Sequence, residues 1–164
     1  MKDTPKKNKG ATGNAEVAGG QPGSGAPLRA IHFPHDADIG IGGLGPTLEA
    51  AFEQGALAMT AVMTDPAKIK LEEAVRIECE APNAELLFVD WLNAIIFEMA
   101  TRGMIFGAFK VSIEGLRLGG VATGEAICVE RHSPAVEIKG ATLTELAVVE
   151  DRPGVWRAQC VVDV

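Results

Sequence analysis

Hydrophobic positions recur every three or four residues in two stretches of the chain, and each stretch predicts an amphipathic helix. The first runs over about 47–63, where Thr47 is a good N-cap and Asp65 and Pro66 stop the helix. The second runs over about 83–102. Its apolar residues cover most of its circumference, so we expect this helix to be central in the fold.

Alternating hydrophobic and polar positions predict strands elsewhere. The helices come early and the strands cluster late, which predicts an α+β fold with two main helices packed on a largely antiparallel β-sheet. A glycine-rich segment at 42–46 predicts a turn before the first helix. The predicted strands lie near 29–33, 70–81, 109–114, 116–130, 135–149 and 155–164.

The first 27 residues differ in composition from the rest. They are rich in glycine and contain few large apolar residues, so we expect a disordered tail over 1–27 and a single domain over 28–164. The tail carries four lysines and two acidic residues. Because the whole chain of 164 residues has a net charge of −7, residues 28–164 stand at −9.

This acidic balance argues against direct nucleic-acid binding through a broad basic face, because phosphate neutralisation needs clustered cations. No apolar run reaches the length of a membrane span, and no secretory signal is evident at the start. Three widely spaced cysteines without a CxxC pair form no disulfide framework or zinc motif, so a cytoplasmic location is expected.

Carboxylates in two distant segments are candidates for cation chemistry. If the segment after His35 is extended, Asp36 and Asp38 share one face and repel unless a cation or hydrogen-bond donors satisfy them. Asp163 lies next to the last residue, Val164, whose oxygens add further ligands for a hard cation such as Ca²⁺ or Mg²⁺.

Structural interpretations of the same residues stay open. Asp36 and Asp38 also suit turn and cap positions, and Asp163 suits a solvated strand end. A lone histidine such as His35 is more often a hydrogen-bonded structural residue than a catalyst. Lys139 is expected to face Glu125 in an ordinary pair across neighbouring strands.

Short motifs in a fixed order carry a resemblance to a known family. From about residue 31 to 164 the chain resembles archease, the small protein that assists the tRNA-splicing RNA ligase. The matching pieces are His35-Asp36-Ala37-Asp38-Ile39-Gly40-Ile41, Gly45-Pro46-Thr47-Leu48-Glu49-Ala50-Ala51-Phe52, Val62-Met63-Thr64-Asp65, Leu86-Leu87, Asp90-Trp91-Leu92-Asn93, Gly124-Glu125, His132, Glu137-Ile138-Lys139-Gly140-Ala141-Thr142 and Val162-Asp163-Val164.

The resemblance implies a metal-binding accessory protein, not an enzyme. It implies that Asp38, Asp163 and the carbonyl of Val164 hold a calcium-type ion. Asp36, His35 and Lys139 are further candidates for accessory residues at this site. The resemblance further implies an RNA-splicing ligase as partner, whose guanylylation and multiple turnover the protein promotes in tRNA splicing or RNA repair.

The chain departs from the family pattern at two places, and two other functions remain as alternatives. Asp36 stands where the family often has Thr, and Leu143-Thr144 stand where it usually has Tyr-His. The alternatives are a metal-dependent phosphoester hydrolase and a more general chaperone-like binding module. Phosphoester turnover by the chain alone would favour the first alternative.

Overall fold

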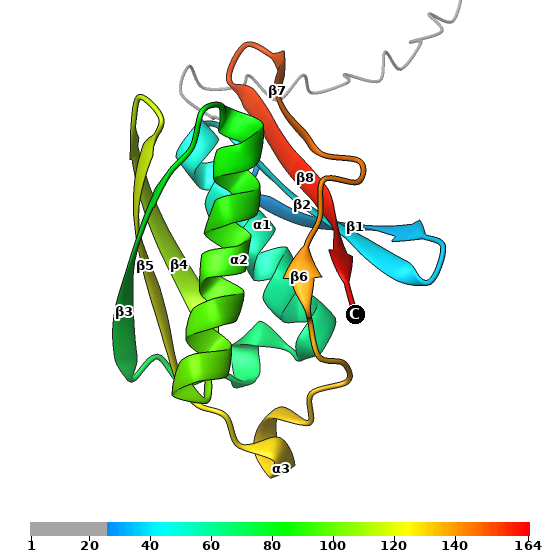
Figure 1. Cartoon of the computed structure of the whole chain (residues 1–164), viewed down its shortest axis with the longest axis vertical. Coiled ribbons are helices and arrows are strands. Elements are labelled where there is room, and N and C mark those ends of the chain that lie inside the picture. Colours follow the sequence, from blue (N-terminus) through cyan, green and yellow to red (C-terminus); the bar gives the residue numbers. More distant parts are fainter. Residues whose placement is uncertain (1–25) are drawn as a thin grey trace, which may run out of the picture.

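The structure is a computed structural model that describes residues 26–164. Residues 1–25 lie outside the described residues, and with them nearly all of the tail that the composition predicts for 1–27. Figure 1 shows a three-stranded sheet on one side, a five-stranded sheet on the other, and two long helices between them. The α+β prediction is confirmed, and the antiparallel strands divide between two sheets.

The five-stranded sheet is built around the last strand of the chain. Strand β8 (Val155–Asp163) pairs on one edge with β2 (Asp38–Gly45), which pairs in turn with β1 (Arg29–His35). Two short strands share the other edge of β8, namely β6 (Gly140–Ala141) and β7 (Ala147–Arg152). Every pairing is antiparallel.

The three-stranded sheet has the order β3-β5-β4, again antiparallel. Its strands are β3 (Glu73–Glu80), β4 (Met104–Glu114) and β5 (Arg117–Ala126). The predicted strands at 70–81 and 109–114 correspond to β3 and to the second half of β4. The strand β4 begins five residues earlier than its alternation indicates, and its register shifts between Phe106 and Ala108.

The two long helices begin and end close to where the sequence predicts. Helix α1 (Leu48–Met63) follows Thr47, whose hydroxyl accepts from the Ala50 amide at 3.1 Å. Helix α2 (Ala84–Arg102) follows Asn83, whose side chain accepts from the Leu86 amide at 2.8 Å. It ends at Gly103, whose φ of 62° is in the left-handed region that glycine adopts without strain. Short helical segments η1 (Pro66–Lys68) and α3 (Val129–His132) lie in connections.

Both long helices pack against both sheets. The Thr60 hydroxyl of α1 donates to the Phe106 carbonyl of β4 at 2.9 Å, and the α1 backbone lies against Gly43 of β2. On α2, the fully buried Trp91 packs over Gly120 of β5 and donates through Nε1 to the Phe52 carbonyl at 3.2 Å. The core of the protein therefore lies in the helical layer between the sheets. No helix within residues 26–164 combines the length and apolar character that crossing a membrane requires.

The turn predicted at 42–46 is wrong, because most of that segment belongs to β2. The glycines of β2 allow other parts of the protein to pack close to the strand. A Cβ at Gly43 would lie 2.1 Å from the Ala51 carbonyl oxygen of α1, and one at Gly40 would lie 2.1 Å from the Phe33 ring. The strand therefore needs glycine where a helix and an aromatic ring approach it closely. In the sequence, such glycines look the same as the glycines of a turn.

The strand predicted over 135–149 is also largely wrong. Only Gly140–Ala141 and the start of β7 are strand within it, and residues 133–139 run as irregular chain from α3 to β6. This irregular segment is instead anchored to the core, since the apolar Ile138 is buried. The Ala135 amide of the segment also donates to the Met63 carbonyl at 2.8 Å.

Candidate cation site at the end of the five-stranded sheet

All residues that the sequence singled out for cation chemistry lie at the end of the five-stranded sheet where β8 finishes. The site is positioned by the turn between β1 and β2, by the end of β8 and by the start of β6 (Figure 1). These residues are His35, Asp36, Asp38, Lys139, Asp163 and Val164.

Asp38 and Asp163 come from strands that are far apart in sequence and adjacent in space. Ile39 of β2 pairs with Val162 of β8, so the next row of this register places Asp38 beside Asp163. Residues in one row of an antiparallel pair point to the same face of the sheet. Because Gly43 faces α1 and the faces alternate along β2, Asp38 and Asp163 belong to the outer face.

Hydrogen bonds from backbone amides connect both acidic residues to neighbouring segments. The Asp38 Oδ1 atom accepts from the Val164 amide at 3.4 Å, which links the start of β2 to the last residue of the chain. The Asp163 carbonyl accepts from the Lys139 amide at 2.8 Å. Asp38 and Val164 are half-buried, whereas Asp163 and Lys139 are exposed, so the site is open to solvent.

His35 and Asp36 lie on the turn side of the site. His35 ends β1 and stands directly across from Asp38 in the register of the hairpin. Asp36 is exposed, and its φ of 47° is in the left-handed region, which Asp tolerates better than most residues do. The structural interpretation of Asp36 as a turn residue is therefore supported. Because the segment is a turn and not extended, the shared face expected for Asp36 and Asp38 is wrong.

The arrangement is chemically suited to a hard cation. Two carboxylates in one row repel each other, and a bound cation relieves that repulsion. No group of three His, Cys, Asp or Glu side chains within residues 26–164 is placed to hold a metal ion. A cation here would therefore take its remaining ligands from backbone carbonyls and water, which Ca²⁺ accepts readily and Zn²⁺ seldom does.

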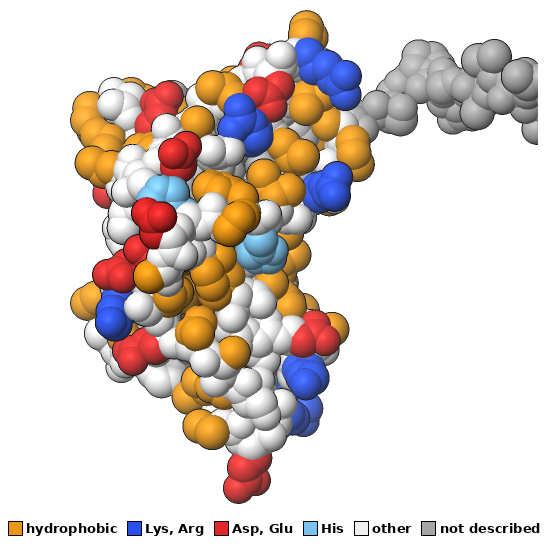
Figure 2. All heavy atoms as spheres, turned by 90° about the vertical axis from the view of Figure 1, so that its right-hand side faces the viewer, with side chains coloured by type: hydrophobic (Ala, Val, Ile, Leu, Met, Phe, Trp, Pro, Cys, Tyr) orange, Lys and Arg blue, Asp and Glu red, His pale blue; other side chains and the backbone are white. Residues whose placement is uncertain are grey.

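The side of the molecule toward which the β1–β2 hairpin points is shown in Figure 2. Hydrophobic side chains occupy the middle of this face, and acidic side chains gather along one flank, next to a histidine. On the outer face of the sheet the Phe33 ring covers Gly40. This side of the molecule therefore presents a mixed apolar and acidic surface.

A buried ion-pair cluster at the other end of the 127–139 segment has no counterpart in the sequence prediction. Glu125 is only 5% exposed and accepts from the Arg131 guanidinium, from the Lys70 amide and from His132 Nε2, the last at 3.2 Å. The Cys128 amide donates to Nδ1 of His132 at 2.8 Å, so in the neutral ring the proton is on Nε2, facing Glu125. Hydrogen bonds from the Arg131 guanidinium hold the pKa of Glu125 well below its usual range.

This cluster corrects the expected pairing of Glu125 with Lys139. Glu125 belongs to β5 of the three-stranded sheet, whereas Lys139 leads into β6 of the other sheet, so the two are not on neighbouring strands. Glu125 occupies an outward position in the alternation of β5 and is buried by α3 and by the chain near Lys70. Because this cover comes from distant segments, no local pattern signals the burial of Glu125.

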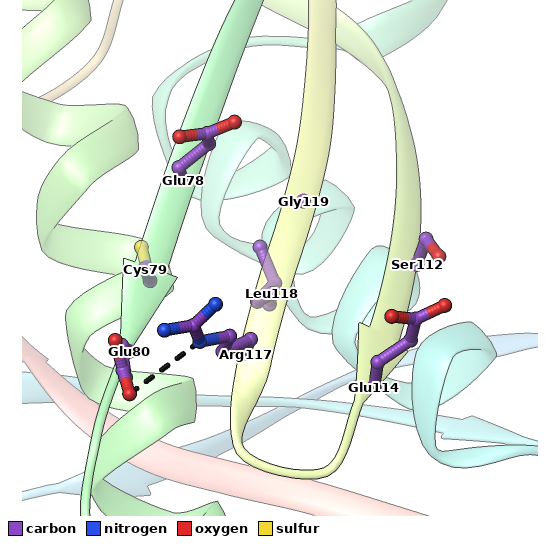
Figure 3. Close-up of a pocket in the computed structure, with 8 residues that line it drawn as sticks. All are labelled: Glu78, Cys79, Glu80, Ser112, Glu114, Arg117, Leu118 and Gly119. Atoms are coloured by element: carbon purple, nitrogen blue, oxygen red, sulfur yellow. Dashed lines mark ion pairs between the residues drawn. The ribbon is translucent and has the colours of Figure 1, made fainter.

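A surface hollow of about 610 Å³ lies on the three-stranded sheet and does not involve the candidate site. Figure 3 shows Glu78, Glu80 and Glu114 around it, with Arg117 paired to Glu80 at 3.5 Å. Both partners of this ion pair are largely exposed, so solvent screens their attraction. We regard the hollow as an open, solvated surface of the sheet.

Fold and site together define a small α+β protein in which two antiparallel sheets enclose two helices and the Asp38 carboxylate accepts from the amide of the last residue at one sheet end. The sequence profile of the Archease protein family (MTH1598/TM1083) matches residues 31–164. The chain belongs to the archease family, and the resemblance seen in the sequence motifs is confirmed.

Individual relatives agree with this assignment. The archease of Pyrococcus furiosus is 38% identical over 137 residues, which cover 81% of this chain and 96% of that protein. The archease of Thermococcus gammatolerans is 36% identical over the same share of both chains. The solution structure of Methanobacterium thermoautotrophicum protein 1598 is similar with a TM-score of 0.72 at 33% identity, covering 82% of this chain and 98% of that one.

Proposed function

We propose that this protein is a cation-binding accessory factor that activates an RNA-splicing ligase. The ligase would join RNA ends that carry a 3′-phosphate or a 2′,3′-cyclic phosphate to 5′-hydroxyl ends. The protein would promote the guanylylation of the ligase and its multiple turnover, in tRNA splicing or in RNA repair. Membership of the archease family supports this role, because it is the activity that the family resemblance implies.

The observation that carries the proposal is the hydrogen bond from the Val164 amide to the Asp38 carboxylate, directly beyond the last β2–β8 pair, Ile39 and Val162. In this proposal the carboxylates of Asp38 and Asp163 and the Val164 carbonyl hold one Ca²⁺ ion, or another hard divalent cation such as Mg²⁺. When bound, the cation supplies positive charge to an acidic surface. His35 and Asp36 flank the site from the turn, and Lys139 fixes the Asp163 carbonyl through its backbone amide.

The net charge also supports a protein partner over RNA. Residues 28–164 stand at −9, so an RNA backbone is repelled, while a basic protein surface is attracted and its association is accelerated. The exposed position of Asp163 suits such contact. RNA is reached, in this proposal, through the ligase.

The test is a guanylylation assay with purified ligase, GTP and calcium, run with Asp38→Asn and Asp163→Asn. Each substitution keeps the side-chain shape and removes the charge. We expect calcium affinity and stimulation of the ligase to fall at least ~10-fold, because loss of a residue that merely orients a metal ligand already costs that much. Glu114→Gln is the control, because it removes an exposed carboxylate on the other sheet.

Full stimulation by both site variants would refute the cation role. Stimulation that is absent even with the unaltered protein would refute the accessory role itself. An arm without ligase measures phosphoester hydrolysis by the chain alone, and turnover there would favour the hydrolase alternative.

A further inference from the structure

The strand β6 is only two residues long, yet it forms one wall of the candidate site. Gly140 pairs with Asp163 and Ala141 pairs with Val162, and the preceding Lys139 amide donates to the Asp163 carbonyl. Asp163 is therefore held between β2 on one side and β6 on the other. So short a strand has few hydrogen bonds of its own to keep it in place.

The edge of β6 that faces away from β8 is paired by a side chain of α2. The Ala141 amide donates to Asn93 Oδ1 at 2.9 Å, and Asn93 Nδ2 donates to the Ala141 carbonyl at 3.4 Å. One carboxamide thus satisfies both the donor and the acceptor of Ala141, as a neighbouring strand would. The orientation of the amide follows from this, because the Ala141 N–H requires an acceptor.

Asn93 projects from a rigid part of the molecule. Trp91 and Leu92, which precede it on α2, are both fully buried in the core between the sheets. Asn93 itself is half-buried at the margin of that core. Its carboxamide therefore fixes β6 to the helical layer, and through β6 it fixes the backbone of Asp163.

We propose that Asn93 is a positioning residue for the candidate cation site. The inference rests on the proposed function of that site. Asn93 contacts neither the carboxylates nor the cation. It determines where β6 lies, and β6 holds the backbone of Asp163 through the Lys139 amide and the pairing of Gly140 with Asp163.

The experiment compares the full chain carrying Asn93→Ala with the unaltered chain and with Val75→Ala. Alanine removes both hydrogen bonds to Ala141 and is a better helix former than Asn, so the loss falls on β6 and not on α2. Val75 is 3% exposed in β3 of the other sheet, so Val75→Ala lowers stability without contact to the site. Calcium titration calorimetry measures affinity, and amide hydrogen exchange measures the order of Lys139, Ala141 and Thr142.

With Asn93→Ala, exchange of the Ala141 and Lys139 amides should rise about tenfold, the factor for one lost hydrogen bond. The calcium dissociation constant should rise by roughly tenfold, the low end for residues that orient a metal ligand. With Val75→Ala the melting temperature should fall while the calcium dissociation constant stays unchanged.

Three outcomes would overturn parts of this account in distinguishable ways. Unchanged exchange and unchanged calcium affinity in Asn93→Ala would refute the positioning role and leave the cation site standing. Faster exchange with unchanged affinity would refute the coupling between β6 and the site. Absence of calcium binding by the unaltered chain would refute the cation site, and with it the role of Asn93 there.

Discussion

The close approach of α1 to β2 at Gly43 makes the substitution Gly43→Ala a sharp test of the packing. A Cβ at this position would lie 2.1 Å from the Ala51 carbonyl oxygen, 2.4 Å from the Gly55 nitrogen and 2.8 Å from the Gln54 carbonyl carbon. All three are backbone atoms of α1, so no rotamer change relieves the clash. Contacts of Cβ atoms below 3.0 Å essentially never occur, so the helix must withdraw by about 0.9 Å to relieve the first of them.

The magnitude follows from the cost of overpacking. Inserting a methyl group into a close-packed interior typically costs 1–3 kcal/mol, and here both sides of the contact are backbone, so we expect a loss of about 3 kcal/mol or more in the free energy of unfolding. For a domain of this size, such a loss lowers the melting temperature by roughly 10 °C. Urea unfolding followed by circular dichroism measures the free energy directly.

The matched control is Gly119→Ala near the start of β5. A Cβ there has no atom within 4 Å, so the change should be neutral or should stabilise by up to about 1 kcal/mol, because alanine has less freedom in the unfolded chain. Equal unfolding midpoints for the two variants would refute the claim that β2 carries glycine because α1 lies against it.

Two further predictions concern the ion-pair cluster and a helix start. The Arg131 guanidinium holds the pKa of Glu125 well below its ordinary value of 4.5, so the stability that Glu125 contributes is complete above about pH 4.5 and is lost as the pH falls toward the lowered pKa. Acid unfolding curves should therefore be flatter for Glu125→Gln than for the exposed control Glu78→Gln, and identical curves would contradict the cluster. Asn83→Ala removes the N-cap of α2 and should cost about 1 kcal/mol in urea unfolding; a change within error would show that α2 does not depend on this cap.

Local signals were sufficient for the two long helices. Thr47, Asn83 and Gly103 occupy the cap positions that their chemistry favours, and the helices differ from the predicted ranges by a single residue at the start. Caps and periodicity act within one or two turns of the chain, so they can be recognised without knowledge of the partners.

The errors arose where a residue serves a distant contact. The glycines of β2 predict a turn because the contacts that require them, with the backbone of α1 and the Phe33 ring, are not visible in the local sequence. The segment 135–149 was interpreted as strand, although most of it is a crossing between the two sheets. Glu125 was paired with the wrong partner for the same reason.

The sequence by itself determined the helices, the α+β class, the family and the identity of the candidate ligands, because these depend on local pattern and on short motifs in order. The tertiary structure decided that the strands form two sheets, and that Asp38 meets a segment 126 residues further along the chain. The register of β2 against β8 fixes that meeting, and register depends on which faces are buried throughout the sheet. Asn93 gains its proposed role only from the position of α2 against β6, a placement that packing in the helical layer determines and no local pattern encodes.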